Sequence, residues 1–354
     1  MIKVVALTPG LHTPSSRFRV RQFIEPLSLM DILVSEYTGH IGQSSTFPWI
    51  GKYFRVRYYF PIFIAWLVLK ICVRFPDILR ANRADVVWLQ RELVEGVVSW
   101  EPLLRKPFVF DVDDAIWTSR PFGKASIAKI AGLAKVVVVG NEYLAEWFKK
   151  YAKHVEIIPT AIDTARFCPA QQDMSIDEIF IIGWTGSGGN LSYLYEIENS
   201  LQKILQRHPN IELQIISDQK PFFQTLPIKQ VKYLAWTPEN EAILLKSFDV
   251  GLMPLPDNEF SRGKCSFKML QYMSVGLPVV VSPVGMNRDL LAKGSIGFSA
   301  VSDDDWVTAL DWLYNNQNEG KKMGLNGRDI VIREYSQEVV CKKLEAIFKS
   351  AAKG

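Results

Sequence analysis

The sequence predicts an α/β protein of two doubly wound domains in series, each with a parallel β-sheet flanked by helices. Three observations carry this prediction. The length of 354 residues fits two domains of roughly 150–180 residues better than one core. A hydrophobic fraction of 48% with 22% charged residues excludes a disordered chain. Short runs rich in Val and Ile alternate with helical patterns, as expected for parallel strands joined by crossover helices.

The expected strands are short apolar runs that fall into two series. They are Ile2–Leu7, Val86–Leu89, Phe108–Asp111, Val136–Val139 and Val155–Ile158, then Ile179–Trp184, Glu212–Ser217, Val231–Tyr233, Val250–Met253 and Pro278–Ser282. Helical patterns between them include Leu191–Gln206, Glu239–Ser247 and Phe267–Val275. Two such series imply two doubly wound domains.

The boundary between the domains is expected within Pro159–Asp173, where prolines and polar residues interrupt the pattern. We therefore expect an N-terminal domain over residues 1–165 and a C-terminal domain over 174–335. Residues 336–354 are expected to form an amphipathic helix that packs back toward the N-terminal domain. Two facing domains would leave a cleft at the carboxyl ends of their strands, where ligands bind in open α/β sheets.

The composition excludes several classes. The four cysteines are scattered with no CxxC pair, and the four histidines show no metal-ligand spacing, so neither a disulfide scaffold nor a zinc site is expected. The first residues offer only Lys3 and a short apolar run, which is not the pattern of a signal peptide. We expect a reduced, cytoplasmic protein.

The net charge of +4 is unevenly distributed. Residues 1–165 carry 21 Lys and Arg against 15 Asp and Glu, and the remainder carries 20 against 22. Residues 37–83 alone hold seven basic residues and one acid, Asp77. This excess is small and not arranged on a nucleic-acid reading motif, so no nucleic-acid partner is expected.

The most informative segment is Asp249–Val280, where a strand, a polar loop and a helix follow one another. The loop holds Arg262, Gly263 and Lys264, and the helix begins near Ser266. A helix amino end with neighbouring cations suits a diphosphate. Lys268 and Gln271 are three residues apart, so they share a helix face and could hold a phosphate and its ribose. The alternative from spacing alone is a solvated basic loop before an ordinary amphipathic helix.

This segment resembles the donor-binding segment of GT-B glycosyltransferases of family 4. The resemblance lies in Arg262–Lys268 (RGKCSFK), Leu270–Met273 (LQYM), Gly276–Val280 (GLPVV) and Ser282–Asn287 (SPVGMN). It implies that the C-terminal domain binds a nucleotide diphosphate sugar. The family's pair of glutamates maps to Gly263, the donor-sugar position, and Gln271, the ribose position, so both acids are replaced here. The donor-binding residues implied are Arg262, Gly263, Lys264, Ser266, Phe267, Lys268 and Gln271.

A second phosphate-side element is the glycine-rich turn in Ile182–Leu191 (IGWTGSGGNL). Its glycines permit a close backbone approach to a ligand, although the spacing is neither a dinucleotide fingerprint nor a Walker loop. A plain strand–helix turn is the alternative. The stretch resembles the start of the second domain in the same family, which adds Gly186 and Ser187 to the expected donor site.

In the first domain, Pro9–Gln22 follows the first strand and carries Gly10, Arg17, Arg19 and Arg21. Ser15 or Ser16 could cap the helix, and Arg17 and Arg21 share a face that could hold a phosphate. A solvated helix start is the alternative. The stretch resembles the family's SSRFRV element, which implies acceptor-side roles for Gly10, Arg17 and Arg19.

A strand ending in three carboxylates comes next, with Asp111, Asp113 and Asp114 inside FDVDDAIW. Such a cluster is costly unless the groups are paired or functional, and capping of the next helix by Asp114 is the alternative. Asp113 and Asp114 match the family's DxDDAxW element, which implies catalytic positions. Asn141, in a match to VVVGNxYLA, is expected on the acceptor side, with helix capping as its alternative.

Residues 40–83 match the family least. They contain the uncharged run Phe60–Leu69, far short of the roughly 20 residues that span a bilayer. Basic and aromatic residues flank it, so residues 52–83 are a candidate contact for an anionic membrane surface. A buried helix of the first domain is the alternative.

The resemblance implies a retaining glycosyltransferase that moves a hexose to a glycan or lipid-linked acceptor in polysaccharide or glycolipid synthesis. Lys264 and Lys268 would stabilise the leaving diphosphate, and Asp113 and Asp114 would orient the reacting groups. No metal or other cofactor is expected, because the family relies on cations and helix dipoles. The expected location is cytoplasmic, with peripheral contact to the inner face of the cell membrane. A non-catalytic nucleotide-sugar or glycan-binding subunit and a GT-B epimerase stay open.

Overall fold

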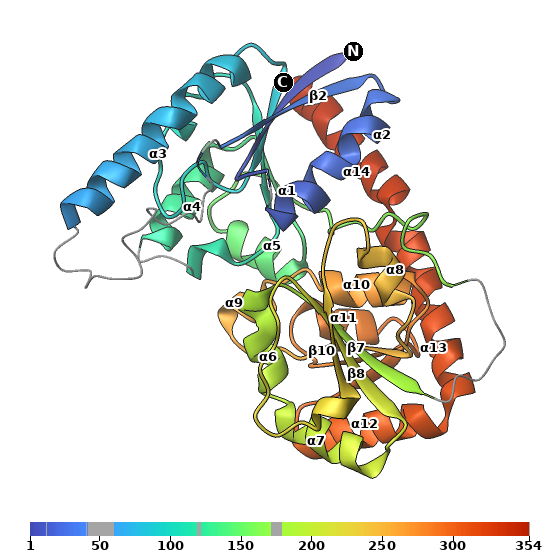
Figure 1. Ribbon diagram of the computed structural model, residues 1–354. Helices are drawn as coiled ribbons and strands as arrows, with labels where there is room; N and C mark the ends of the chain where they lie inside the picture. Colours follow the sequence, from blue (N-terminus) through green and yellow to red (C-terminus); the bar gives the residue numbers. More distant parts are fainter. Residues whose placement is uncertain (12, 40, 42–59, 119–121, 171–178, 354) are drawn as a thin grey trace. The chain divides into compact units, whose positions relative to one another are not determined.

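The computed structural model describes residues 1–11, 13–39, 41, 60–118, 122–170 and 179–353. The chain forms two compact units: residues 1–161 with 337–354, and residues 162–336. Each unit holds one six-stranded parallel sheet with helices around it (Figure 1).

The sheet of the N-terminal unit has the order β2-β1-β3-β4-β5-β6. Its strands are β1 (Ile2–Thr8), β2 (Ile32–Thr38), β3 (Val86–Gln90), β4 (Phe108–Val112), β5 (Val136–Val139) and β6 (Val155–Ile157). The central strands are buried on both faces because helices cover them, which explains their continuous apolar runs.

The helices of this unit are α1 (Pro14–Arg19), α2 (Ile24–Ser28), α3 (Phe60–Ala81), α4 (Gly123–Leu133), α5 (Glu142–Phe148) and α14 (Gln337–Ala352). The last helix, α14, belongs to this unit although it ends the chain, and Figure 1 shows it in red beside α2. Its apolar face enters the core, where the Phe348 ring meets the Trp88 ring edge-on at 5.0 Å.

The sheet of the C-terminal unit has the order β12-β11-β10-β7-β8-β9. Its strands are β7 (Phe180–Thr185), β8 (Ile211–Ser217), β9 (Val231–Ala235), β10 (Val250–Met253), β11 (Val279–Val281) and β12 (Gly297–Ser299). This is the strand order of the Rossmann fold.

The helices of this unit are α6 (Leu191–Tyr195), α7 (Glu198–Arg207), α8 (Glu241–Leu245), α9 (Glu259–Arg262), α10 (Phe267–Ser274), α11 (Met286–Leu291), α12 (Asp303–Asn315) and α13 (Gln317–Ile330). Helices α7 and α12 lie side by side in Figure 1 and cover one core of the sheet. The leucines and isoleucines of α7 recur at helical spacing and are buried in that core.

The structure corrects two expectations about secondary structure. The single helix expected over Leu191–Gln206 is two, α6 and α7. The chain makes a tight turn between them, where the Ile197 amide donates to the Leu194 carbonyl three residues back. Ser15 and Ser16 do not cap α1, since the helix begins at Pro14 and both serines lie buried within it.

Helix α3 contains the uncharged run and continues to Ala81 with Pro76 inside it. No helix within the described residues is long and apolar enough to cross a membrane. The first part of the proposed membrane contact, residues 52–59, lies outside the described residues.

Candidate functional site

The glycine-rich turn and the basic loop meet at the carboxyl ends of two neighbouring strands. Strand β7 leads into the turn and β10 into the loop, and these strands pair in the middle of the sheet. From β7 the chain continues to β8 on one side, and from β10 to β11 on the other. Such a reversal of strand order opens a crevice that binds ligands in α/β proteins.

Tyr272, on α10, ties the two strand ends together. Its hydroxyl accepts a hydrogen bond from the Thr185 amide at 2.9 Å and donates to the Leu252 carbonyl at 3.2 Å. A side chain at Gly251 would overlap the Tyr272 ring, since a methyl group there would lie 2.2 Å from it. The buried phenol therefore fixes α10 against both strands, and burial raises its pKa.

The loop before α10 is held by the segment Ser282–Asn287. Ser266 lies in the left-handed region with φ +50° and is buried, and its Oγ donates to Asn287 Oδ1 at 2.6 Å. Gly285 has φ +53° and approaches the Arg262 carbonyl so closely that a methyl group there would lie 2.5 Å from the oxygen. The predicted donor residue Ser266 thus uses its hydroxyl to shape the loop.

The Ser266 side chain makes no capping hydrogen bond to α10. The first N–H groups of a helix have no acceptor within the helix and carry a partial positive charge. Phe267, the first residue of α10, contributes one of these backbone groups. The amino end of α10 therefore adds to the positive potential of the two lysines beside it.

Lys268 lies on the glycine-rich turn. Its Nζ lies 5.3 Å from the centre of the Trp184 ring, a cation–π contact that fixes the cation. A methyl group at Gly186 would lie 2.6 Å from the Trp184 ring and 2.8 Å from Lys268 Cε. Only glycine at 186 leaves the lysine in this place.

Lys264 lies against two aromatic rings from different elements. Its Nζ is 4.7 Å from the centre of the Phe260 ring on α9 and 5.6 Å from that of Tyr193 on α6, and Figure 1 shows these helices side by side. Lys268 therefore contacts the glycine-rich turn itself, and Lys264 contacts α6, the helix that follows this turn. The structure thus brings Gly186, Ser187, Lys264, Lys268 and the amino end of α10 together.

Two other predicted donor residues have protein partners. Arg262 forms a bidentate pair with Asp257, at 2.6 and 3.1 Å, which lowers the pKa of that carboxyl. Gln271 is buried and donates from Nε2 to Glu241 Oε1 at 2.8 Å. Gly263 ends α9, and its amide bonds back to carbonyls of that helix.

In the N-terminal unit, Arg91 organises the predicted carboxylates. It lies directly after β3 with φ +59°, a conformation that is costly for a residue with a side chain and is found at functional sites. Its Nε donates to Asp113 Oδ1 at 2.8 Å and its Nη2 to Asp114 Oδ2 at 2.6 Å. The two aspartates therefore share one cation and are held at the carboxyl end of β4.

Asp111, the third carboxylate, is buried and paired with Arg19. Arg19 Nε donates to Asp111 Oδ1 at 2.9 Å, and Trp88 Nε1 donates to Oδ2 at 3.1 Å. Arg19 Nη1 also donates to the Ile158 carbonyl at 2.8 Å. Arg19, an expected acceptor residue, is thus buried, and its side chain links α1 to the sheet from inside the core.

The other predicted acceptor residues differ in their surroundings. The Gly10 carbonyl accepts from Arg21 Nη2 at 2.9 Å, so Arg21 holds this loop. Arg17 is partly exposed, with its guanidinium 4.5 Å from the Phe18 ring centre. Asn141 caps α5 by accepting from the Leu144 amide at 2.9 Å, which was the alternative expected for it.

Glu92, beside Arg91, is a carboxylate that sequence reasoning missed. It is 3% exposed, and its Oε1 accepts from the Gly96 amide at 3.3 Å. Burial raises its pKa to about 7. Sequence reasoning also missed Arg91, the partner of Asp113 and Asp114, and Glu241, the partner of Gln271. Each lies 20 or more residues from its partner, so only the charges that follow the strands could have indicated them.

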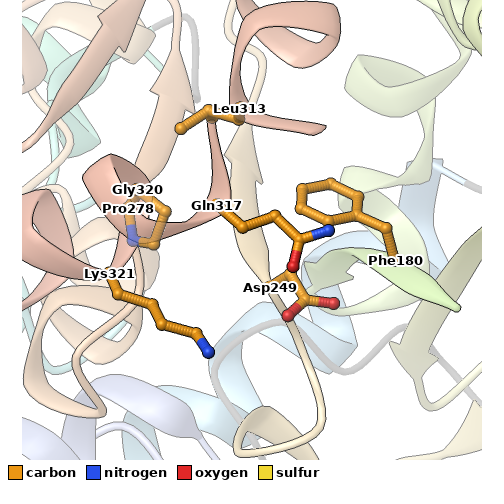
Figure 2. A pocket seen from close by; sticks show the side chains of 7 residues that line it. All are labelled: Phe180, Asp249, Pro278, Leu313, Gln317, Gly320 and Lys321. Carbon is orange, nitrogen blue, oxygen red and sulfur yellow. The ribbon is translucent and has the colours of Figure 1, made fainter. Parts of the chain in front are cut away.

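A small cavity of about 20 Å³ lies elsewhere in the C-terminal unit (Figure 2). Phe180 begins β7, and Asp249 and Pro278 immediately precede β10 and β11. The cavity therefore opens at the amino ends of the strands, opposite the lysines. None of the predicted site residues lines it.

The fold class follows from this topology and from comparison with solved structures. The chain has the GT-B fold, two Rossmann-like domains in series. Sucrose-phosphate synthase from Thermosynechococcus elongatus is similar over 99% of both chains, with a TM-score of 0.74 at 13% identity. Anabaena HepE in complex with UDP and glucose is similar over 99% of this chain and 100% of its own, with a TM-score of 0.67 at 12% identity. At these identities the likeness shows the fold.

The match to a family model falls on the C-terminal unit. Residues 180–316 match the family model of glycosyl transferases group 1. The capsular polysaccharide biosynthesis glycosyltransferase CapM of Staphylococcus aureus is 22% identical over 188 residues, which cover 50% of this chain and 48% of CapM. The chain thus spans about half the length of this relative, and the family match lies on the unit that carries the two lysines.

Proposed function

We propose that this protein is a retaining glycosyltransferase that transfers a hexose from a nucleotide diphosphate sugar to a glycan or lipid-linked acceptor, in polysaccharide or glycolipid synthesis. The donor binds the C-terminal unit at the glycine-rich turn, and the acceptor binds the N-terminal unit. The proposed family is glycosyltransferase family 4, and the proposed location is cytoplasmic.

One observation carries the donor assignment. Lys268 lies on the Trp184 ring beside Gly186, at the point where the strand order reverses. Lys264 lies just before α10, on aromatic rings of α6 and α9. This arrangement suits a diphosphate, because it combines two cations, a helix amino end and a turn without side chains. The family match over residues 180–316 supports the same unit, and the similar Anabaena protein was solved with UDP.

The chemistry asked of these residues is electrostatic. As the bond between the anomeric carbon and the diphosphate breaks, its electron pair stays on the leaving phosphate oxygen, where Lys264 and Lys268 stabilise the charge. The acceptor hydroxyl oxygen bonds to the anomeric carbon on the same face, and its proton passes to the leaving phosphate. Asp113 and Asp114, held by Arg91, orient the acceptor hydroxyl. No metal ion takes part in this proposal.

The first experiment is a thermal-shift screen with UDP-, GDP- and ADP-sugars, followed by measurement of transfer and hydrolysis. We expect one nucleotide class to raise the melting temperature and to release its nucleoside diphosphate. Lys264→Ala and Lys268→Ala should each lower transfer by about 10²-fold, the scale of losing one charge-stabilising group. Unchanged rates in both variants would overturn the donor assignment.

The same experiment separates the alternatives. Binding without turnover indicates a non-catalytic subunit. An isomeric sugar nucleotide formed without release of the nucleoside diphosphate indicates an epimerase.

We also propose that α3 contacts an anionic membrane surface. The helix presents a row of exposed apolar side chains: Phe63, Ile64, Val68, Leu69, Phe75 and Leu79 are 39–59% exposed. Ile64, Val68, Phe75 and Leu79 recur at helical spacing and share one face. Arg80 and Arg83 lie at the end of the row and are exposed, which favours an anionic surface over a neutral one.

Liposome flotation tests this contact. We expect the protein to float with vesicles of anionic lipid and not with neutral ones, and Val68→Gln combined with Leu79→Gln to abolish flotation. The matched control is Phe222→Gln with Ile228→Gln, which removes two apolar side chains that are 79% and 89% exposed in the C-terminal unit. Equal absence of binding to both kinds of vesicle would overturn the proposal.

A further inference from the structure

A buried pair of polar side chains lies on the helix that carries Lys268. Gln271 is three residues further along α10, so the two side chains share a helix face. Gln271 is 2% exposed and Glu241, the first residue of α8, is 5% exposed. The hydrogen bond from Gln271 Nε2 to Glu241 Oε1, at 2.8 Å, joins them.

This hydrogen bond decides which end of the amide faces outward. A carboxylate accepts hydrogen bonds and donates none, so it can pair only with the NH₂ end of the glutamine. Arg166 Nη2 lies 3.9 Å from the other carboxylate oxygen, Glu241 Oε2. The amide therefore turns its carbonyl oxygen, Oε1, away from Glu241.

Gln271 Oε1 is available to a ligand. Within the described part of the chain it accepts no hydrogen bond, and it is not one of the fully buried polar atoms that lack a partner, so it reaches solvent. An amide oxygen held in this way is a hydrogen-bond acceptor with a fixed direction. A hydroxyl group can donate to it as it would to a carboxylate oxygen. The amide oxygen itself carries no negative charge. That charge lies on Glu241, the hydrogen-bond partner of Gln271.

We infer that Glu241 is a positioning residue that fixes Gln271 with its amide oxygen toward the ribose of the donor, so that a ribose hydroxyl can donate to it. The inference rests on the proposed donor site. The pair thereby does the work of a single ribose-binding carboxylate, and the site selects ribonucleotides over nucleotides without ribose hydroxyls. Lys268 on the same helix face holds the phosphate of the same nucleotide.

The test compares UDP with 2′,3′-dideoxyuridine diphosphate by calorimetric titration, with the corresponding GDP and ADP pairs in parallel. For the wild-type protein we expect the ribonucleotide to bind about 10-fold more tightly, the scale of one hydrogen bond. Glu241→Ala should lower this ratio to below about 3-fold, since the amide is no longer fixed. Glu239→Ala, which removes an exposed carboxylate of the same loop, is the control and should leave the ratio unchanged.

An exchange variant keeps the test valid if Glu241→Ala does not fold. Glu241→Gln combined with Gln271→Glu re-forms the pair with donor and acceptor reversed, and places a carboxylate oxygen toward the ribose. We expect it to retain the wild-type ratio. A role in stability alone would change the melting temperature of these variants and leave the ratio where it is.

Gln271→Met separates this inference from the proposed function. If Gln271→Met lowers the ratio while Glu241→Ala keeps it, Glu241 does not position the amide and the inference is wrong, although the donor site stands. If the exchange variant loses the ratio, the inference is wrong as well. If wild-type protein binds ribonucleotides and dideoxynucleotides equally, or binds none of the nucleotides, the ribose contact of the proposed function is itself contradicted.

Discussion

Glu92 is a buried carboxylate whose ionisation should weaken the N-terminal unit. Its carboxyl group has a pKa of about 7 in the folded protein, raised by burial from 4.5. The folded protein therefore holds this proton more tightly than the unfolded chain does. Stability from this group is fully present below about pH 4.5 and is lost as the pH rises through 7.

The size of the effect follows from the two pKa values. Their difference corresponds to about 3 kcal/mol in the free energy of unfolding, because each tenfold change in proton affinity is worth about 1.4 kcal/mol. Glu92→Gln removes the ionisation and keeps an oxygen for the Gly96 amide. We expect the variant to gain about 2.5 kcal/mol relative to wild type between pH 5 and pH 8, because part of the loss in wild type occurs below pH 5.

Urea denaturation at pH 5, 6, 7 and 8, followed by tryptophan fluorescence, measures this difference. Glu142→Gln removes a carboxylate that is 58% exposed in the same unit and serves as the control for the loss of one charge. A stability difference between Glu92→Gln and wild type that is the same at pH 5 and pH 8 would refute the reasoning.

Three further outcomes can be checked. Arg91→Ala leaves two partly buried aspartates without their shared cation. We expect it to lower the free energy of unfolding, measured in urea, by about 3 kcal/mol. A loss below about 0.5 kcal/mol would contradict the pairing. Gly285→Ala should lower both the melting temperature and the nucleotide affinity, since φ at this position is +53° and the added methyl group would meet the Arg262 carbonyl. Gly294→Ala is the control and should change neither, because the nearest contact of its methyl group is at 3.8 Å. A chelator such as EDTA should leave sugar transfer unchanged in a radiolabel assay, and recovery of lost activity by a divalent cation would show that a metal takes part.

Much of the fold could be predicted from the sequence because the central strands are buried on both faces. Val136–Val139 is one such strand, and its apolar run is continuous. The two strands that were not predicted, Ile32–Thr38 and Gly297–Ser299, are edge strands of the two sheets. Edge strands are half solvated and short or mixed in polarity, so β2 reads ILVSEYT and β12 only GFS.

Only the local motifs of the candidate site could be predicted from the sequence. The lysines and the glycine-rich turn are local motifs, and their spacing along the chain indicates an anion site. The partners that fix them are distant in sequence, such as Tyr193 for Lys264 and Glu241 for Gln271. Whether a charged residue is paired inside the core, as Arg19 is with Asp111, depends on contacts between elements and not on spacing.

The central claim is that a diphosphate binds at the glycine-rich turn. Its most direct test is calorimetric titration of two glycine variants with UDP, with GDP and ADP measured in parallel. Gly186→Ala places a methyl group 2.8 Å from Lys268 Cε, whereas a methyl group at Gly189 meets nothing within 4 Å. We expect Gly186→Ala to weaken nucleoside diphosphate binding by about 10-fold or more, the value of one charge-assisted hydrogen bond, and Gly189→Ala to bind like wild type. Equal affinities in wild type and both variants would contradict the claim.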